Sequence, residues 1–199
     1  MGQRLVITLE QNDKAVAAIY YHWSAYTYSA LEETKSVIDC IYNKEDEPIN
    51  MTLLRLIQHL EANGGGIRGN DEEFAYIKSL YPNAEFKTDG YSRNNGIIAL
   101  SPQGITDLRG WSEGDVYINL DTDQVDFCVY GGYEGLEEYL EERKEWDDEF
   151  DENDFKHIPK YDICLGYFGV NEIDDVLSVI GGTNEHVIQC NGEVCELIE

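Results

Sequence analysis

A run of carboxylate side chains between residues 134 and 154 is the part of the sequence best suited to recognise another molecule. Twelve acidic residues stand there against two basic ones, Arg143 and Lys144. Such a density of like charge costs self-repulsion, so a partner that binds anions would explain it. The candidate partner-binding residues are Glu134, Glu137, Glu138, Glu141, Glu142, Glu145, Asp147, Asp148, Glu149, Asp151, Glu152 and Asp154.

The spacing of this run predicts an acidic helix over residues 133–146 and an acidic loop over residues 147–154. Apolar side chains recur on one helical face, at Leu136, Tyr139, Leu140 and Trp146. Carboxylates lie along another face of this helix, about 5–6 Å apart. For comparison, duplex DNA carries one phosphate charge per about 1.7 Å of its axis. Helix and loop together could occupy a Lys/Arg groove built for nucleic acid. The alternative is a solvated helix and loop that bind nothing.

An aromatic segment over residues 20–28 is the second candidate site. His22, Trp23 and Tyr26 could line a pocket that stacks a base or a sugar, with Arg68 and Arg93 as phosphate contacts. This interpretation predicts a nucleotide-like ligand, bound by a small-molecule binder or an enzyme. The alternative is a strand end whose aromatic side chains fill the core.

Other motifs are incomplete. The glycine-rich segment 63–70 follows a helix and lacks the lysine-serine ending of a phosphate loop, which favours a connector. The segment beginning at Asp121 starts like a calcium loop but lacks the glycine at its sixth position and the glutamate at its twelfth. The four histidines and the serines match no catalytic motif. We therefore expect no enzymatic activity, no metal site and no cofactor.

The composition limits the choice of partner. The chain has 199 residues, a net charge of −26 and 42% hydrophobic residues, which is enough for a substantial core. The charge disfavours direct binding of nucleic acid or anionic membranes and favours a basic, nucleic-acid-binding protein. No stretch approaches the about 20 apolar residues of a membrane span, and no signal peptide is visible. We expect a cytoplasmic protein, and the sequence does not indicate its oligomeric state.

Five cysteines are an odd number at irregular spacing, which predicts reduced thiols. Cys190 and Cys195 flank an Asn-Gly pair that predicts a two-residue hairpin turn. In that register Cys190 faces Glu193 and Cys195 faces Ile188. The two sulfurs would then be diagonal neighbours that pack together without forming a disulfide.

Hydrophobic periodicity and turn residues predict one α+β domain over residues 1–199, with packed helices and a mainly antiparallel sheet because many strands close through hairpins. Strands are expected at 4–10, 16–21, 96–100, 116–120, 125–130 and 163–168. Helices outside the acidic run are expected at 29–42, 51–62, 71–80, 102–108 and 170–180. The expected N-caps are Ser29, Asn50, either Asn70 or Asp71, and Ser101.

Residues 4–7 (RLVI), 21–27 (YHWSAYT) and 92–101 (SRNNGIIALS) resemble uncharacterised small acidic proteins of bacterial phages and prophages. The resemblance covers residues 1–130 and supplies no functional residues. It implies a context only, because such proteins are often inhibitors of host or defence proteins. A phage-encoded protein would act in the cytoplasm of the host cell.

Three functions follow from these observations. The first is an inhibitor of a nucleic-acid-handling protein, such as a defence nuclease or a CRISPR effector, acting through a carboxylate surface that mimics nucleic acid. The second is the small-molecule binder or enzyme with a pocket near His22. The third is an assembly protein whose charge serves solubility alone.

Overall fold

A nine-stranded sheet organises the protein in a computed structural model, which describes residues 3–42, 47–87, 91–131, 140–141, 144–145, 151 and 162–198. The strands are β1 (Leu5–Gln11), β2 (Lys14–Tyr21), β3 (Gly66–Ile67), β4 (Ile97–Ala99), β5 (Gly114–Asn119), β6 (Gln124–Gly131), β7 (Asp162–Gly169), β8 (Val187–Asn191) and β9 (Cys195–Ile198). Their order across the sheet is β3-β4-β2-β1-β5-β6-β7-β8-β9.

Five α-helices lie within the described residues. They are α1 (Thr27–Ile41), α2 (Ile49–Ala62), α3 (Asp71–Leu80), α4 (Pro102–Arg109) and α6 (Ile173–Ile180). Two short 3-10 turns, η1 (Arg93–Asn95) and η3 (Val170–Glu172), precede β4 and α6. The prediction of an α+β protein is confirmed.

The sheet is mixed, so the prediction of a mainly antiparallel sheet is wrong. Four antiparallel pairs join strands that are consecutive among the described elements, as expected, and a fifth joins β2 to the distant β4. Three other pairs are parallel: β1 with β5, β3 with β4, and β7 with β8. In each of these three cases a helix-containing connection returns the chain in the same direction, and such long-range pairings leave no mark in the local sequence pattern.

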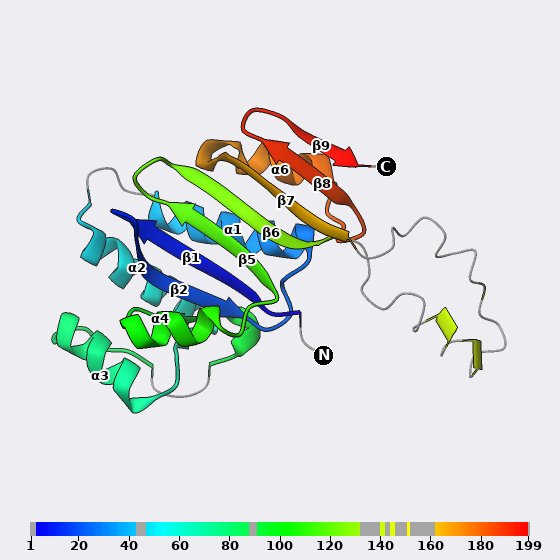
Figure 1. Cartoon of the computed structure of the whole chain (residues 1–199). Coiled ribbons are helices and arrows are strands. Elements are labelled where there is room, and N and C mark those ends of the chain that lie inside the picture. The colour runs from blue at the N-terminus through cyan, green and yellow to red at the C-terminus, as the bar shows by residue number, and fades with distance from the viewer. Residues whose placement is uncertain are drawn as a thin grey trace.

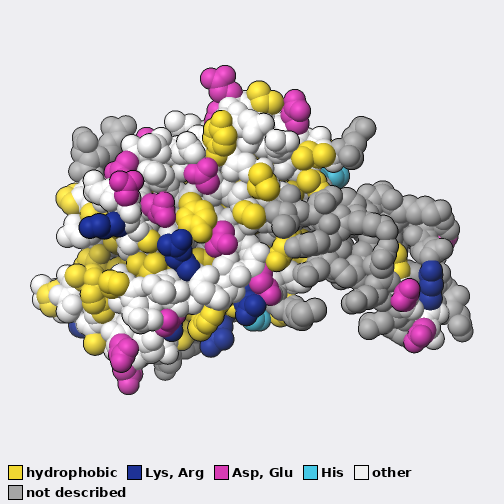
Figure 2. Space-filling view, in the orientation of Figure 1, with side chains coloured by type: hydrophobic (Ala, Val, Ile, Leu, Met, Phe, Trp, Pro, Cys, Tyr) yellow, Lys and Arg dark blue, Asp and Glu magenta, His cyan; other side chains and the backbone are white. Residues whose placement is uncertain are grey.

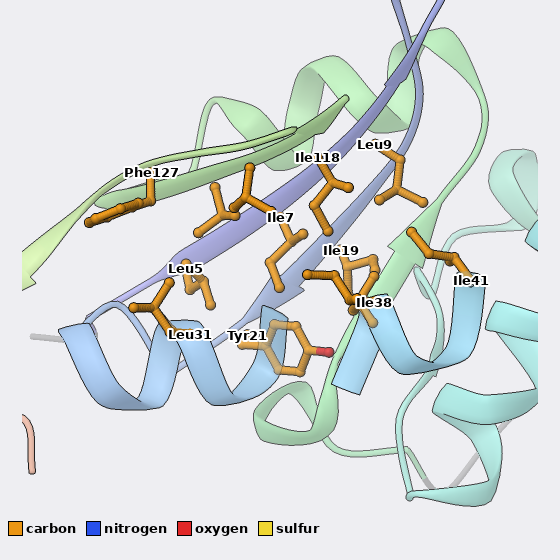
Figure 3. Close-up of a cluster of buried hydrophobic side chains, with 14 of the residues drawn as sticks. Leu5, Ile7, Leu9, Ile19, Tyr21, Leu31, Ile38, Ile41, Ile118 and Phe127 are labelled. Carbon is orange, nitrogen blue, oxygen red and sulfur yellow. The ribbon is translucent and has the colours of Figure 1, made fainter. Parts of the chain in front are cut away.

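The two faces of the sheet are covered unequally (Figure 1). Alternate residues of β1, such as Leu5 and Ile7, point toward α1 and pack with Leu31 and Ile38 in the main core (Figure 3). The opposite face is covered by α4 only over β1, β2 and β4, through a second cluster of Val6, Ala18, Tyr20, Ile97, Ala99, Ile105 and Leu108. The remaining half of that face is open in the described residues, where exposed hydrophobic side chains lie among charged ones (Figure 2).

Two of the four predicted caps are confirmed. Asn70 accepts a hydrogen bond from the Glu73 backbone N–H, and Ser101 accepts one from Gly104. Helix α1 begins before Ser29, whose backbone N–H and hydroxyl instead meet the side chain of Asn184. Helix α2 also begins earlier than predicted, directly after Pro48, so Asn50 is not its cap.

Cys190 and Cys195 are directly opposite each other on β8 and β9 and form a disulfide. The prediction of a reduced, diagonal pair is therefore wrong. The turn lies one residue further along the chain than the Asn-Gly pair predicts, because Asn191 N donates a hydrogen bond to Val194 O and Gly192 and Glu193 form the turn. This displacement changes the register and brings the two sulfurs together.

A buried carboxylate joins α3 to the start of α4. Glu73 is 1% exposed, and its Oε1 accepts hydrogen bonds from Leu100 N at 2.7 Å and Ser101 N at 3.0 Å. The hydroxyl of Ser101 donates to Glu73 Oε2. A negative charge at the N-terminus of a helix interacts favourably with the helix dipole. Glu73 therefore stabilises the start of α4 both through hydrogen bonds and through the charge of its carboxylate.

Replacing Glu73 with alanine should lower the free energy of unfolding by about 3 kcal/mol, because two backbone N–H groups would lose their acceptor. Urea denaturation followed by circular dichroism measures the change. The exposed neighbour Glu72 is the control, and Glu72→Ala should cost no more than about 1 kcal/mol. Equal effects of the two substitutions would contradict this role of Glu73.

Candidate functional site

The acidic run lies mostly outside the described residues. Of its twelve carboxylates, Glu141, Glu145 and Asp151 are described and exposed, and the other nine are not described. Leu140, Glu141, Lys144 and Glu145 have helical conformation. The predicted loop over residues 147–154 lies outside the described residues except for Asp151.

The strands that flank the acidic run pair with each other along their whole length. The β6–β7 ladder runs from Gln124↔Gly169 to Gly131↔Asp162. Two adjacent antiparallel strands need only about two to five residues to connect them. Residues 132–161, hereafter the acidic insertion, contain all twelve carboxylates and far exceed that need.

The predicted aromatic site is partly assembled. The ring centroids of His22 and Trp23 are 4.6 Å apart in an edge-on arrangement. His22 Nδ1 lies 2.6 Å from the hydroxyl of Tyr20, and the His22 backbone N–H donates to the carbonyl of Arg93 at 3.1 Å. Tyr26 is not part of this group, since it forms a bridge with Tyr130 at the start of α1.

Arg68 reaches the same group through Trp111, which the sequence did not single out. The Trp111 ring packs edge-on against Tyr20 at 5.6 Å, and the Arg68 guanidinium lies 5.5 Å from the Trp111 ring centre. Arg68 also forms a salt bridge with Asp107 at 2.7 Å. This positive charge is compensated within the protein, which weakens the assignment of Arg68 as a phosphate contact.

The glycine-rich segment 63–70 has a structural explanation. A Cβ atom on Gly65 would overlap the backbone oxygen of Gly96, and one on Gly69 would overlap the hydroxyl of Tyr91. The glycines therefore allow β3 to approach η1 and the Tyr91 side chain closely. This agrees with the connector interpretation of the segment.

The aspartates that resemble a calcium loop form the β5–β6 turn. Asp121 accepts a hydrogen bond from Asn12 N, and Asp123 accepts one from the hydroxyl of Tyr42 at 2.7 Å. Within the ranges that the structure describes, no three His, Cys, Asp or Glu side chains are placed to hold a metal ion together.

A polar pocket of about 340 Å³, which was not predicted from the sequence, lies between α1, α2 and η1. Helix α1 contributes Glu33 and Ser36, which are three residues apart, and α2 contributes His59 and Asn63, which are four apart. Such spacings place each pair on one helix face, and this spacing is the only feature of the sequence that indicates the pocket. The other lining residues are Tyr21, Leu60, Asn94 and Asn95.

Hydrogen bonds connect the wall of the polar pocket. Ser36 Oγ lies 3.0 Å from His59 Nε2. The side-chain amide of Asn63 donates to the His59 carbonyl at 2.9 Å, and the amide of Asn95 donates to the Asn63 carbonyl at 2.8 Å. These contacts fix donors and acceptors around the cavity before any ligand arrives.

Glu33 is the charged group of the pocket. Its pKa is raised to about 7, mainly by burial and also by the charge of neighbouring Glu32, while a hydrogen bond with Ser24 opposes the shift. The salt bridges among the described residues do not include Glu33. A half-buried carboxyl with a raised pKa in a cavity is typical of functional sites.

Three features can thus take part in binding: the acidic insertion, the group around His22 and the polar pocket. No protein family model, curated protein or solved structure matches the chain. None of the described helices has the length and apolar composition needed to cross a membrane. Geometry and charge are therefore the basis for choosing among the three features.

The Glu33 pKa predicts a specific pH dependence of stability. The unfolded state has the lower pKa, so the folded state binds more protons between about pH 4.5 and 7, and Glu33 makes the protein less stable as pH rises through that range. Glu33→Gln should therefore gain stability over the wild type as pH increases from 5 to 8. Urea denaturation at both pH values tests this, with Glu32→Gln as control. An equal difference at both pH values would contradict the raised pKa.

Proposed function

We propose that the protein is an acidic binding protein whose acidic insertion docks on the basic, nucleic-acid-binding surface of another protein. A defence nuclease or CRISPR effector is the kind of partner that this chemistry fits, and binding would exclude its nucleic acid. The observation that carries the proposal is the complete β6–β7 ladder. Because that hairpin closes without the insertion, the carboxylates there need a reason other than folding.

The charge of the insertion supports the same partner class. Its twelve carboxylates are opposed by four basic residues, Arg143, Lys144, Lys156 and Lys160. The two glutamates described in helical conformation, Glu141 and Glu145, are four residues apart and exposed, as a row of charges on one helix face requires. Electrostatic attraction of this kind speeds association and weakens as salt is added.

Charge reversal tests the proposal. The variant with lysine at Glu138, Glu141, Glu145 and Asp148 should lose at least about 100-fold in partner affinity, because close charge pairs across an interface couple by about 1.5 kcal/mol or more. A bacterial lysate pull-down at low and high salt identifies the partner, and surface plasmon resonance then measures the affinity.

A matched control separates local recognition from overall charge. The control variant has lysine at four exposed carboxylates elsewhere, Glu32, Glu85, Glu193 and Glu196. Like the test variant, it changes the net charge by +8, from −26 to −18. This control should bind within about threefold of the wild type, since its changes lie outside the acidic insertion and charges separated by more than about 10 Å are largely screened. Equal losses in both variants would show that only total charge matters.

Removal of the acidic insertion should leave the fold intact. An Asn-Gly turn in place of residues 132–161 connects Gly131 and Asp162, which are already paired. The thermal midpoint should stay within a few degrees of the wild type, while the partner is no longer recovered. Loss of the folded circular dichroism spectrum would show that the insertion serves folding and would remove the main support for the proposal.

A further inference from the structure

We infer that the polar pocket between α1, α2 and η1 binds a small organic cation, whose ammonium group pairs with the Glu33 carboxylate. This inference is independent of the acidic insertion, because no residue of the insertion lines the pocket. It also differs from the predicted site around His22, which lies on the other side of β2. Tyr20 packs beneath α4, whereas its neighbour Tyr21 faces the main core and the pocket.

The first argument is the missing counter-ion. Lys35, two residues from Glu33, is held by Asp39 and Asp174, each at 3.1 Å from its Nζ. Arg55 of α2 is held by Glu47 and by the backbone carbonyl of Cys40. These two cations are thus engaged with other groups. A carboxylate removed from water without a counter-ion is costly, and a ligand ammonium would supply one.

The second argument is the hydrogen-bonding character of the wall. An ammonium group offers three donors and no acceptor. Most residues that line the pocket carry oxygen acceptors, namely Glu33, Ser36, Tyr21, Asn63, Asn94 and Asn95. The volume of about 340 Å³ suits a small amine.

The third argument excludes the other classes of small ligand. Glu33 is acidic and the pocket wall has no Lys or Arg, which disfavours phosphates and other anions. The described residues offer no three-ligand metal cluster, which disfavours a bound divalent ion. The net charge of −26 raises the local concentration of cations around the whole protein.

The pH dependence of this binding has a defined sign. Glu33 must lose its proton to pair with an ammonium, and with its pKa of about 7 the ionised fraction rises about tenfold between pH 6 and 8. The titratable groups that face it are Glu32 on the same helix, His59 on α2 and Tyr21 on β2. Loss of the Glu33 proton therefore favours amine binding at pH 8.

The test is isothermal titration calorimetry with putrescine, agmatine and spermidine at pH 8 and constant ionic strength. The neutral diol 1,4-butanediol has the length of putrescine without its charge and serves as the ligand control. We expect at least one amine to bind with submillimolar Kd, about tenfold more weakly at pH 6, and no heat of binding from the diol. Failure of all three amines to bind would overturn the inference.

Two single-residue variants locate the binding. Glu33→Gln and Glu32→Gln remove the same charge one residue apart, but only Glu33 lines the pocket, since Glu32 is exposed. Glu33→Gln should weaken amine binding at least tenfold, and Glu32→Gln no more than about twofold. Equal weakening would show diffuse attraction to an acidic surface and would overturn the inference. Both variants should still recover the protein partner, which separates this test from that of the acidic insertion.

Discussion

Burial of β1 on both faces is the constraint on which the rest of the structure depends. Leu5, Ile7 and Leu9 enter the core beneath α1, while Val6 enters the cluster beneath α4. The same strand pairs antiparallel with β2 and parallel with β5, so it joins the α4-covered part of the sheet to the part that ends at β9. A strand in this position must be apolar on both sides, which explains the nearly continuous apolar run at the start of the chain.

Local features of the fold could be predicted from the sequence, and long-range ones could not. Alternating residues in β1 and β2 and the caps Asn70 and Ser101 act over a few positions, so their pattern is readable. The parallel pairing of β1 with β5 depends on residues about a hundred positions apart and on the packing of the helices between them. The earlier start of α1 also has a distant cause, because Ser29 contacts Asn184.

The same distinction applies to the candidate sites. His22 and Trp23 are adjacent in sequence, and their contact was predictable, whereas Trp111 joins them only through the packing of α4 on β2. Glu33 and His59 reach one pocket because α1 packs against α2. The disulfide was missed for a local reason, since the turn forms at Gly192-Glu193, one residue further along than the Asn-Gly pair predicts.

The arginines show how the protein uses its few positive charges. Arg4, Arg55 and Arg68 form salt bridges with Glu113, Glu47 and Asp107, each tying a loop or helix to a neighbouring element. Positive charge is thus used for internal contacts, and the excess of carboxylates is left facing solvent. The sequence has 40 acidic and 14 basic side chains, and Glu33 accordingly has no salt-bridge partner among the residues that the structure describes.

The close approach at Gly65 and Gly69 has a consequence for mutational scanning. Gly65 should reject every side chain, as the glycines of a true phosphate loop do, because the obstacle is a backbone oxygen, whereas a side chain at Gly69 would have to displace the Tyr91 hydroxyl. Intolerance to substitution would then mark a steric junction between β3 and η1. A genetic screen that scored intolerance alone would identify this segment as a nucleotide site, and the Tyr91→Phe change, which removes the hydroxyl next to Gly69, would reveal the difference.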